Sequence, residues 1–216
     1  MYVKDNMIPS PITIKKNQSI SEALDLMSDN NLHRLPVVDD NGKLIGLVTQ
    51  SVITSNTPNN ASTLSVFELN YLLNKLTIND IMIKDVVTIK EDALLEEAAT
   101  ILRKNNIGCL PVVDDDNKLL GIITHNDIFT AFIDLLGYNH NGTRYVINVD
   151  EDVPGIMEDI ARIFKEANTN ISNIAVYKGY RGIEVVVIAY GYDDITSQLK
   201  KAGYNVTSVI KLHEEY

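Results

Sequence analysis

One stretch of this chain occurs twice, and an internal repeat constrains the fold more strongly than any local pattern does. Residues 35–49 return seventy-five positions later as residues 110–124. The same offset relates residues 2–53 to residues 77–128 without a gap, and 21 of these 52 aligned positions are identical. An ungapped match of this length indicates a duplicated structural unit.

Each copy predicts the same order of elements. A short β-like run opens it, at residues 11–14 and again at residues 86–89. A helix follows in each copy, because apolar residues recur at the helical spacing i, i+3, i+4, i+7. These residues are Ile20, Ala23, Leu24 and Met27 in the first copy and Leu95, Ala98, Ala99 and Leu102 in the second. Two apolar runs separated by Asp, Asn and Gly then predict a hairpin, and a second short helix follows.

Local signals set the expected boundaries of these elements. Ser19 and Glu22 have the spacing of a capping box, so the first helix should begin there. Asn30 and Asn31 are poor helix residues and should end it. Pro36 is expected at the start of a strand, where a proline leaves no donor missing from the ladder.

Each copy therefore reads β-α-β-β-α in about fifty residues. A unit of that size buries too little core alone, so the two copies should pack on each other as a pseudo-two-fold pair. The predicted divisions are residues 1–58 for the first repeat, 59–76 for a linker, 77–136 for the second repeat and 137–216 for a further domain. A polar loop at residues 54–63 and a short apolar helix at residues 66–76 join the repeats, and we interpret the helix as a strap packed on the repeats rather than a partner-binding helix.

The C-terminal region has a different pattern. Strand-like and helix-like runs follow one another in the order β-α-β-β-α-β, which is the ferredoxin-like arrangement. The predicted fold class of the whole chain is therefore α/β (α+β).

Composition excludes several classes of function. The net charge of −10 would repel a phosphate backbone, so we expect no nucleic-acid partner. No apolar run reaches the length of a membrane span, and no secretion signal is present, so we expect no membrane association. The single cysteine, Cys109, has no internal disulfide partner, which suits the cytoplasm, and we expect it to be a small buried hydrophobe.

The duplicated unit resembles the CBS domain, and two copies resemble a Bateman module. The Leu-Pro-Val-Val-Asp core and the Gly-apolar-apolar-Thr strand end carry the resemblance, over residues 1–136. The family's adenosine-binding pattern ends in an aspartate, and residues 121–127 match it with Thr124 and Asp127. The resemblance implies that the carboxylate accepts the ribose hydroxyls, the threonine lies near a phosphate and apolar strand residues enclose the base.

In this family such a site combines one copy's threonine and aspartate with the opening strand and a basic pair of the other copy. The implied ligand contacts here are Ile12, Thr13, Ile14, His33, Arg34, Thr124 and Asp127. The implied ligand is AMP, ADP, ATP or S-adenosylmethionine. The first copy has Val52 where the aspartate should be, so we expect one competent site.

Simpler interpretations of these residues remain open. His33 and Arg34 also suit a solvated surface pair. Asp127 also suits a helix N-cap, where aspartate is favoured without any ligand.

The C-terminal region resembles the ACT domain, whose two marker turns match residues 150–155 and 168–171. The resemblance implies a small amino acid bound at a subunit interface by Asp152, Gly155 and Asn170. A structural interpretation is also sufficient for the first turn, because Pro154 suits a helix start and Gly155 a tight turn.

The sequence predicts no enzyme and no metal site. Its four histidines are scattered and have no neighbour at ligand spacing, and no Walker or Ser-His-Asp pattern appears. We therefore expect a cytoplasmic regulatory sensor that binds an adenosine nucleotide and signals to a partner protein. The alternatives are a scaffold protein with a vestigial cleft and an amino-acid sensor acting through the ACT-like domain.

Two further expectations concern assembly and pathway. A homodimer is predicted through the apolar faces of the repeat helices, with Leu24, Met27, Ala99 and Leu102 as candidate contacts. The order of two CBS copies and one ACT domain is similar to that of bacterial acetoin-utilisation regulatory proteins, which suggests control of carbon use.

Overall fold

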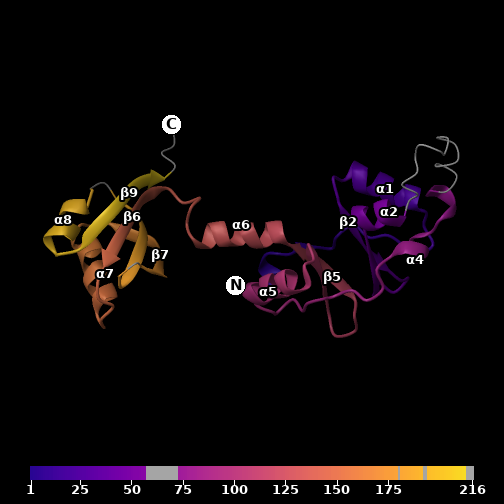
Figure 1. Ribbon diagram of the computed structural model, residues 1–216, viewed down its shortest axis with the longest axis horizontal. Helices are drawn as coiled ribbons and strands as arrows, with labels where there is room; N and C mark the ends of the chain where they lie inside the picture. The colour runs from indigo at the N-terminus through magenta and orange to yellow at the C-terminus, as the bar shows by residue number, and fades with distance from the viewer. Residues whose placement is uncertain (57–72, 180, 192–193, 213–216) are drawn as a thin grey trace. The chain divides into compact units, whose positions relative to one another are not determined.

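The computed structural model describes residues 1–56, 73–179, 181–191 and 194–212 (Figure 1). These residues form two compact units, Met1–Ile128 and Phe129–Tyr216. The described helices include none that combines the length and the apolar character needed to cross a membrane.

The first unit contains both copies of the repeat except for the end of the last helix, which belongs to the second unit. The first copy forms η1 (Val3–Asp5), β1 (Ile8–Pro9), α1 (Ile20–Asp29), β2 (Arg34–Val38), β3 (Leu44–Thr49) and α2 (Gln50–Asn56). The second copy forms α4 (Ile78–Ile81), α5 (Leu95–Asn105), β4 (Cys109–Val113), β5 (Leu119–Thr124) and α6 (His125–Leu135). The helices and hairpins predicted for each copy are confirmed.

Helix α1 begins and ends where its sequence predicts. The side chain of Ser19 accepts a hydrogen bond from the Glu22 amide, and the Glu22 carboxylate accepts one from the Ser19 amide at 2.7 Å. This capping box satisfies two amide donors that the helix leaves unpaired. Asn30 caps the C-terminal end, and Asn31 follows with a φ of 52°.

The two hairpin turns share one hydrogen-bonding device. Asp39 Oδ1 accepts the amides of Asn41 and Lys43, at 2.9 and 2.8 Å. Asp114 Oδ1 accepts the amides at the corresponding positions of the second turn, at 3.0 and 2.8 Å. An aspartate that binds the backbone two residues ahead fixes a turn without help from the core.

The predicted opening strands are wrong in extent. Residues 11–14 form only an isolated parallel bridge between Ile14 and Val37, and residues 86–89 only the bridge between Ile89 and Val112. Ile14 donates to the carbonyl of Pro36 and accepts from the amide of Val38, so a single residue reaches β2. The strand in this part of the chain is β1, two residues long and located earlier.

The expected position of Pro36 is also corrected, because it lies in the middle of β2 and not at its start. Pro36 pairs with Leu47, whose amide and carbonyl both bond to Ile83 on the opposite side of β3. The pair is therefore a non-hydrogen-bonded one, and the missing amide of Pro36 removes no bond from the ladder.

The two copies exchange their opening segments. β1 pairs with β5 of the second copy, with Ile8 opposite Ile122, and Leu47 of the first copy bridges Ile83 of the second. These two pairs are related by the seventy-five-residue offset. The same holds for the hydrogen bonds from Leu44 to Asn117 and from Leu119 to Gly42. Such paired contacts are those of the pseudo-two-fold arrangement that the repeat predicts.

The apolar face of α1 packs into the core of the first repeat. Ile20, Ala23 and Met27 are buried there with Leu35, Val37 and Val48. Leu102 is buried in the same way on α5, and Cys109 is buried as predicted. The prediction that Met27 and Leu102 form a dimer surface is therefore wrong, because the chain's own core already covers them.

The predicted strap lies largely outside the described residues, since residues 57–72 are not among them. Its last part is described, and Leu73 and Leu76 pack against the core of the first repeat. The polar loop was expected to begin at Thr54, but α2 extends to Asn56.

The second unit has the predicted element order. It forms β6 (Gly142–Val149), α7 (Ile156–Glu166), β7 (Asn170–Lys178), β8 (Ile183–Tyr190), α8 (Thr196–Lys201) and β9 (Asn205–Leu212). The four strands form one antiparallel sheet in the order β7-β8-β6-β9. Residues of α7 and α8 share one core with alternate residues of the strands, so both helices cover the same face (Figure 1).

Candidate functional site

A cavity of about 440 Å³ lies in the first unit, where segments of both repeats meet. The first repeat lines it with Ile8, Ser10, Pro11, Ile12, Asn30, Asn31, Leu32, His33, Arg34 and Pro36. The second repeat lines it with Gly108, Ile122, Thr124, His125 and Asn126. The exchanged pairing of β1 with β5 brings these segments together.

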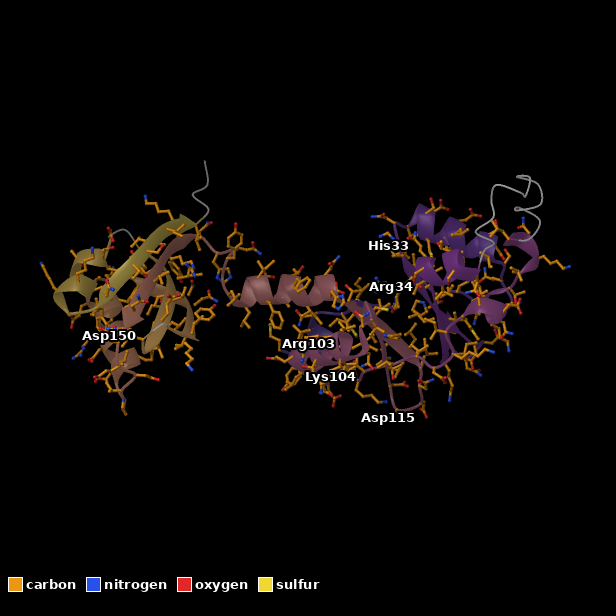
Figure 2. The ribbon with its side chains drawn as sticks, viewed as in Figure 1. His33, Arg34, Arg103, Lys104, Asp115 and Asp150 are labelled. Carbon is orange, nitrogen blue, oxygen red and sulfur yellow. The ribbon has the colours of Figure 1, made fainter. Side chains whose placement is uncertain are left out.

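The basic pair is held at the start of β2 (Figure 2). His33 Nδ1 lies 2.9 Å from Gln50 Oε1, and the carbonyl of His33 accepts the Gln50 amide at 3.0 Å. These two bonds tie His33 to the start of α2. Arg34 is the first residue of β2 and pairs with Thr49.

The guanidinium of Arg34 crosses from the first repeat to the second. A Cβ on Gly108 would stand 2.6 Å from Arg34 Nη1, so only glycine leaves this space for the guanidinium. The thiol of Cys109 also bonds to Arg34; burial raises the pKa of that thiol, and the bond to Arg34 opposes the increase. Gly108 had no role in the sequence interpretation, and only its proximity to Arg34 in space reveals one.

Thr124 and Asp127 form a hydrogen-bonded pair at the start of α6. Asp127 Oδ2 accepts the Thr124 amide at 2.8 Å and the Thr124 hydroxyl at 2.7 Å. Because α6 begins at His125, Thr124 is the N-cap residue and Asp127 is the third residue of a capping box, so the interpretation of Asp127 as the N-cap is wrong. The other carboxylate oxygen, Oδ1, takes no hydrogen bond from the residues that the structure describes. The carboxylate therefore keeps an acceptor for a ligand while it caps the helix.

Only some of the residues that were predicted to contact the ligand line the cavity. Ile12, His33, Arg34 and Thr124 line it. Thr13 and Asp127 are not part of the lining, although Asn126, next to Asp127, is. Ile14 is 1% exposed and belongs to the core of the first repeat, so its side chain cannot contact a ligand there.

Several lining residues were missed by sequence reasoning. Asn30 and Asn31 were interpreted only as helix terminators, yet the left-handed turn at Asn31 places both beside the cavity. Ile122 and His125 flank Thr124 in the adenosine pattern, and that proximity was the available signal.

The lining has a charge opposite to that of the chain. Its ionisable side chains are Arg34, His33 and His125, and no carboxylate lines the cavity, whereas the chain carries a net charge of −10. No carboxylate of the described residues forms an ion pair with Arg34. A cationic cavity with an apolar floor formed by residues such as Ile12, Pro36 and Ile122 suits a ligand with an anionic group and a flat apolar part.

The equivalent position of the first repeat lacks this chemistry. Thr49 Oγ1 lies 2.9 Å from Ser51 Oγ and accepts the Val52 amide at 3.2 Å. Val52 itself has no polar side-chain atom, so this helix start presents no carboxylate.

The ACT-like candidates do not meet in one chain. Gly155 precedes α7 with a φ of 100°, a conformation that favours glycine, and Asp152 is exposed beside it. Asn170 lies beyond the other end of α7 and donates to the hydroxyl of Tyr190. The eleven residues of α7 separate the two ends by roughly 16 Å along its axis. A cavity of about 380 Å³ includes Asn170 but neither Asp152 nor Gly155.

Potential metal ligands are not gathered in the described part of the chain. No three His, Cys, Asp or Glu side chains there come together as a metal site.

Comparison with known proteins identifies the repeat. The model of the CBS domain family matches residues 3–55 and 78–134, which is more than half of the chain. A curated relative, the L-aspartate semialdehyde sulfurtransferase of Methanocaldococcus jannaschii, is 36% identical over 130 residues, and the match covers 60% of this chain. The chain spans only 23% of that relative's length.

Three solved structures are similar to the repeat pair. The CBS domain pair of MJ0100, in complex with 5′-methylthioadenosine and S-adenosyl-L-methionine, is 36% identical with a TM-score of 0.51, over 61% of this chain and 95% of that one. CBSX2 of Arabidopsis thaliana, in complex with AMP, is 30% identical with a TM-score of 0.52, over 62% and 96%. An acetoin utilization protein (AcuB) from Vibrio cholerae is 31% identical with a TM-score of 0.54, over 63% and 93%.

Proposed function

The chain belongs to the CBS domain family, and we propose that its repeat pair is a regulatory module that binds an adenosine-containing nucleotide in the cavity between the two copies. One observation carries the proposal. A cavity floored by apolar side chains brings together Arg34 of one repeat and Thr124 of the other, beside the unused carboxylate oxygen of Asp127.

Each part of the ligand has a complementary group. Ile12, Pro36 and Ile122 offer apolar surface to the base. Asp127 Oδ1 would accept the ribose hydroxyls, and Arg34 would pair with a phosphate through its planar guanidinium. The bond from Thr124 to Asp127 Oδ2 orients the carboxylate, so little side-chain freedom is lost when the ligand binds.

The ligands bound by the similar solved structures indicate which compounds to test with this chain. The MJ0100 pair holds 5′-methylthioadenosine and S-adenosyl-L-methionine, and CBSX2 holds AMP. Adenosine is common to all three. We therefore propose AMP, ADP, ATP and S-adenosylmethionine as the candidate ligands of this chain.

Thermal unfolding with and without each of these four ligands tests the proposal. A ligand that binds only the folded chain stabilises it by about 2.7 kcal/mol at one hundred times its dissociation constant. A rise in melting temperature with at least one adenosine compound, and none with the matching guanosine compound, is expected. No shift with any of the four would favour the scaffold alternative, and turnover of one of them would favour an enzyme.

For the second unit we propose an ACT-type regulatory domain. Its element order and its four-stranded antiparallel sheet support this, as does the left-handed Gly155 at the start of α7. Because Asp152 and Asn170 lie at opposite ends of α7, an amino-acid site made from them needs a second copy of the chain. Calorimetry with each of the twenty amino acids tests whether the chain binds one of them. Light scattering tests whether a second copy of the chain is present.

The wider role is proposed from one similar protein. The V. cholerae AcuB structure shares the repeat pair at 31% identity, so we propose that this chain controls a step of carbon use, of the acetoin type, through a partner protein in the cytoplasm. We further propose a homodimer, with the half-buried Leu24 and Ala99 as the remaining candidate contacts on the repeat helices. Light scattering that gives the monomer mass of 24.1 kDa at micromolar concentration would contradict the dimer.

A further inference from the structure

The sheet of the second unit has one face that its helices do not cover. Tyr145, Ile147, Val185 and Val187 point toward α7 and α8 and form the core with them. Side chains alternate between the two faces of a strand, so the immediate neighbours of these four residues along each strand point away from the helices. Arg144, Val146, Val186 and Ile188 therefore belong to the open face.

A second cavity of about 390 Å³ lies on this open face. Its floor is buried, with Ile188 2%, Val186 5% and Leu212 8% exposed. The rim comes from the exposed residues Leu135, Leu136 and Tyr138, which precede β6. The side chain of Asn173 holds this segment in place, because it donates to the carbonyl of Leu135 at 2.8 Å and contacts His140 Nδ1 at 2.9 Å.

One charged side chain, Arg144, lines this otherwise mostly apolar cavity. Arg144 lies on the central strand β6, opposite Ile188 on one side and Ile210 on the other. No carboxylate of the described residues forms an ion pair with it. Among the residues with a described position, the nearest acidic one by register is Glu184, which pairs with Asn148, four positions along β6 and so roughly 14 Å away.

Arg144 is half-buried between two isoleucines, and its guanidinium gains no ion-pair partner from the described residues. The cost of partly burying an unpaired charge is offset when an anion enters the cavity and pairs with the guanidinium. A single cation matches a single negative charge, and the remaining lining matches a short hydrocarbon chain.

We propose that this cavity binds a small aliphatic monocarboxylate, with its carboxylate on the guanidinium of Arg144 and its chain against Val186, Ile188 and Ile210. The site is separate from the nucleotide cavity of the repeats, and it uses none of Asp152, Gly155 and Asn170. It adds a second ligand class, an organic acid, to the proposed adenosine ligand and does not depend on it.

Calorimetry on the full chain with hexanoate, hexanamide and hexylamine tests the proposal. Hexanoate should bind, while the uncharged amide and the cationic amine of similar shape should bind at least tenfold more weakly. Arg144→Gln should weaken hexanoate binding roughly ten- to a hundredfold, the effect of losing a charge-assisted pair. Its melting temperature should not fall, since no carboxylate among the described residues is paired with Arg144.

Two variants separate the cavity from the rest of the sheet. Ala175→Leu fills the cavity while it keeps Arg144, and should abolish hexanoate binding. Glu184→Gln changes a charge on the same face outside the lining and should leave hexanoate affinity unchanged. Equal binding of hexanoate and hexanamide, or hexanoate binding that survives Arg144→Gln, would overturn the proposal. So would an absence of hexanoate binding together with a dimer that Ala175→Leu dissociates, because a second copy would then fill the cavity.

Discussion

Arg34 of the first repeat occupies the space that a side chain at position 108 of the second repeat would need, because a Cβ on Gly108 would lie 2.6 Å from Arg34 Nη1. Gly108 of the second repeat therefore determines where the guanidinium of the first repeat can lie. The equivalent positions by offset are Cys109 and His33, so the relationship occurs once in the pair. This asymmetry gives the cavity its single arginine.

Replacing Gly108 by alanine should therefore move the cation without unfolding the chain. The atom that the new Cβ meets is the far end of a flexible side chain, so Arg34 can shift away. Stability should change by less than about 1 kcal/mol, as for substitutions away from a tightly packed core. Affinity for AMP should fall, and affinity for adenosine, which has no phosphate, should not. Calorimetry with both ligands decides; equal losses for both would contradict the role given to Arg34.

Replacing Arg34 itself should remove the attraction for phosphate. Arg34→Gln should weaken binding of AMP roughly ten- to a hundredfold, and Arg34→Lys should retain part of it, since lysine lacks the planar fork. The dependence of AMP affinity on salt should also flatten in Arg34→Gln. Fluorescence titrations at two ionic strengths measure both effects. An unchanged affinity for AMP would mean that Arg34 is only part of a solvated surface pair with His33.

The parts of the fold that the sequence predicts are those set by neighbours along the chain. The capping box at Ser19, the asparagine that ends α1 and the aspartate turn at Asp39 each act over two to four residues. The internal repeat also predicts contacts between the two copies, because identical segments at a constant offset imply that such contacts occur in pairs. The bonds from Leu44 to Asn117 and from Leu119 to Gly42 are of this kind.

What the sequence did not predict depends on contacts between segments far apart. β1 is only two residues long, and its pairing with β5 involves residues more than a hundred positions away, for which no local pattern exists. Ile14 was assigned to the ligand from its place in the opening run, whereas packing directs it into the core. The predicted use of Met27 as a dimer contact failed for the same reason, since a helical stripe does not say what covers it.

The capping box predicts a pH-dependent contribution to stability. The amide of Ser19 bonds to Glu22 and, with the side chains of Gln18 and Ser19, lowers the pKa of that carboxyl from its ordinary value of 4.5. A lowered pKa in the folded state means that the contribution is present above pH 4.5 and is lost as the pH falls through the lowered value. Because Glu22 is exposed, the effect should be small.

Thermal unfolding of Glu22→Ala at several pH values tests this. The difference from wild type should be largest near neutral pH and should shrink below pH 4.5. Glu97, at the matching position of the second repeat, is a suitable control, because the N-cap residue of α5, Leu94, makes no side-chain cap bond. Glu97→Ala should show no such trend; the same trend in both variants would assign the effect to general charge rather than to the cap.

The last prediction concerns the difference between the two repeats at one position. Asp127 binds Thr124 through Oδ2 and keeps Oδ1 for a ligand, whereas Val52, its counterpart, has no polar atom. A carboxylate that accepts hydroxyl groups contributes about 1.5–3 kcal/mol, so Asp127→Ala should weaken adenosine-ligand binding roughly ten- to a hundredfold. The same variant also breaks the capping box between Thr124 and Asp127, which lowers the stability of the start of α6. Asp127→Asn separates the two effects, since the amide oxygen can still accept the Thr124 bonds while the charge is gone.

Val52→Ala should change affinity little, and calorimetry should give one ligand per chain. Two equal sites per chain would show that the aspartate does not decide which repeat is competent, and wild-type affinity in Asp127→Ala would place the ribose elsewhere.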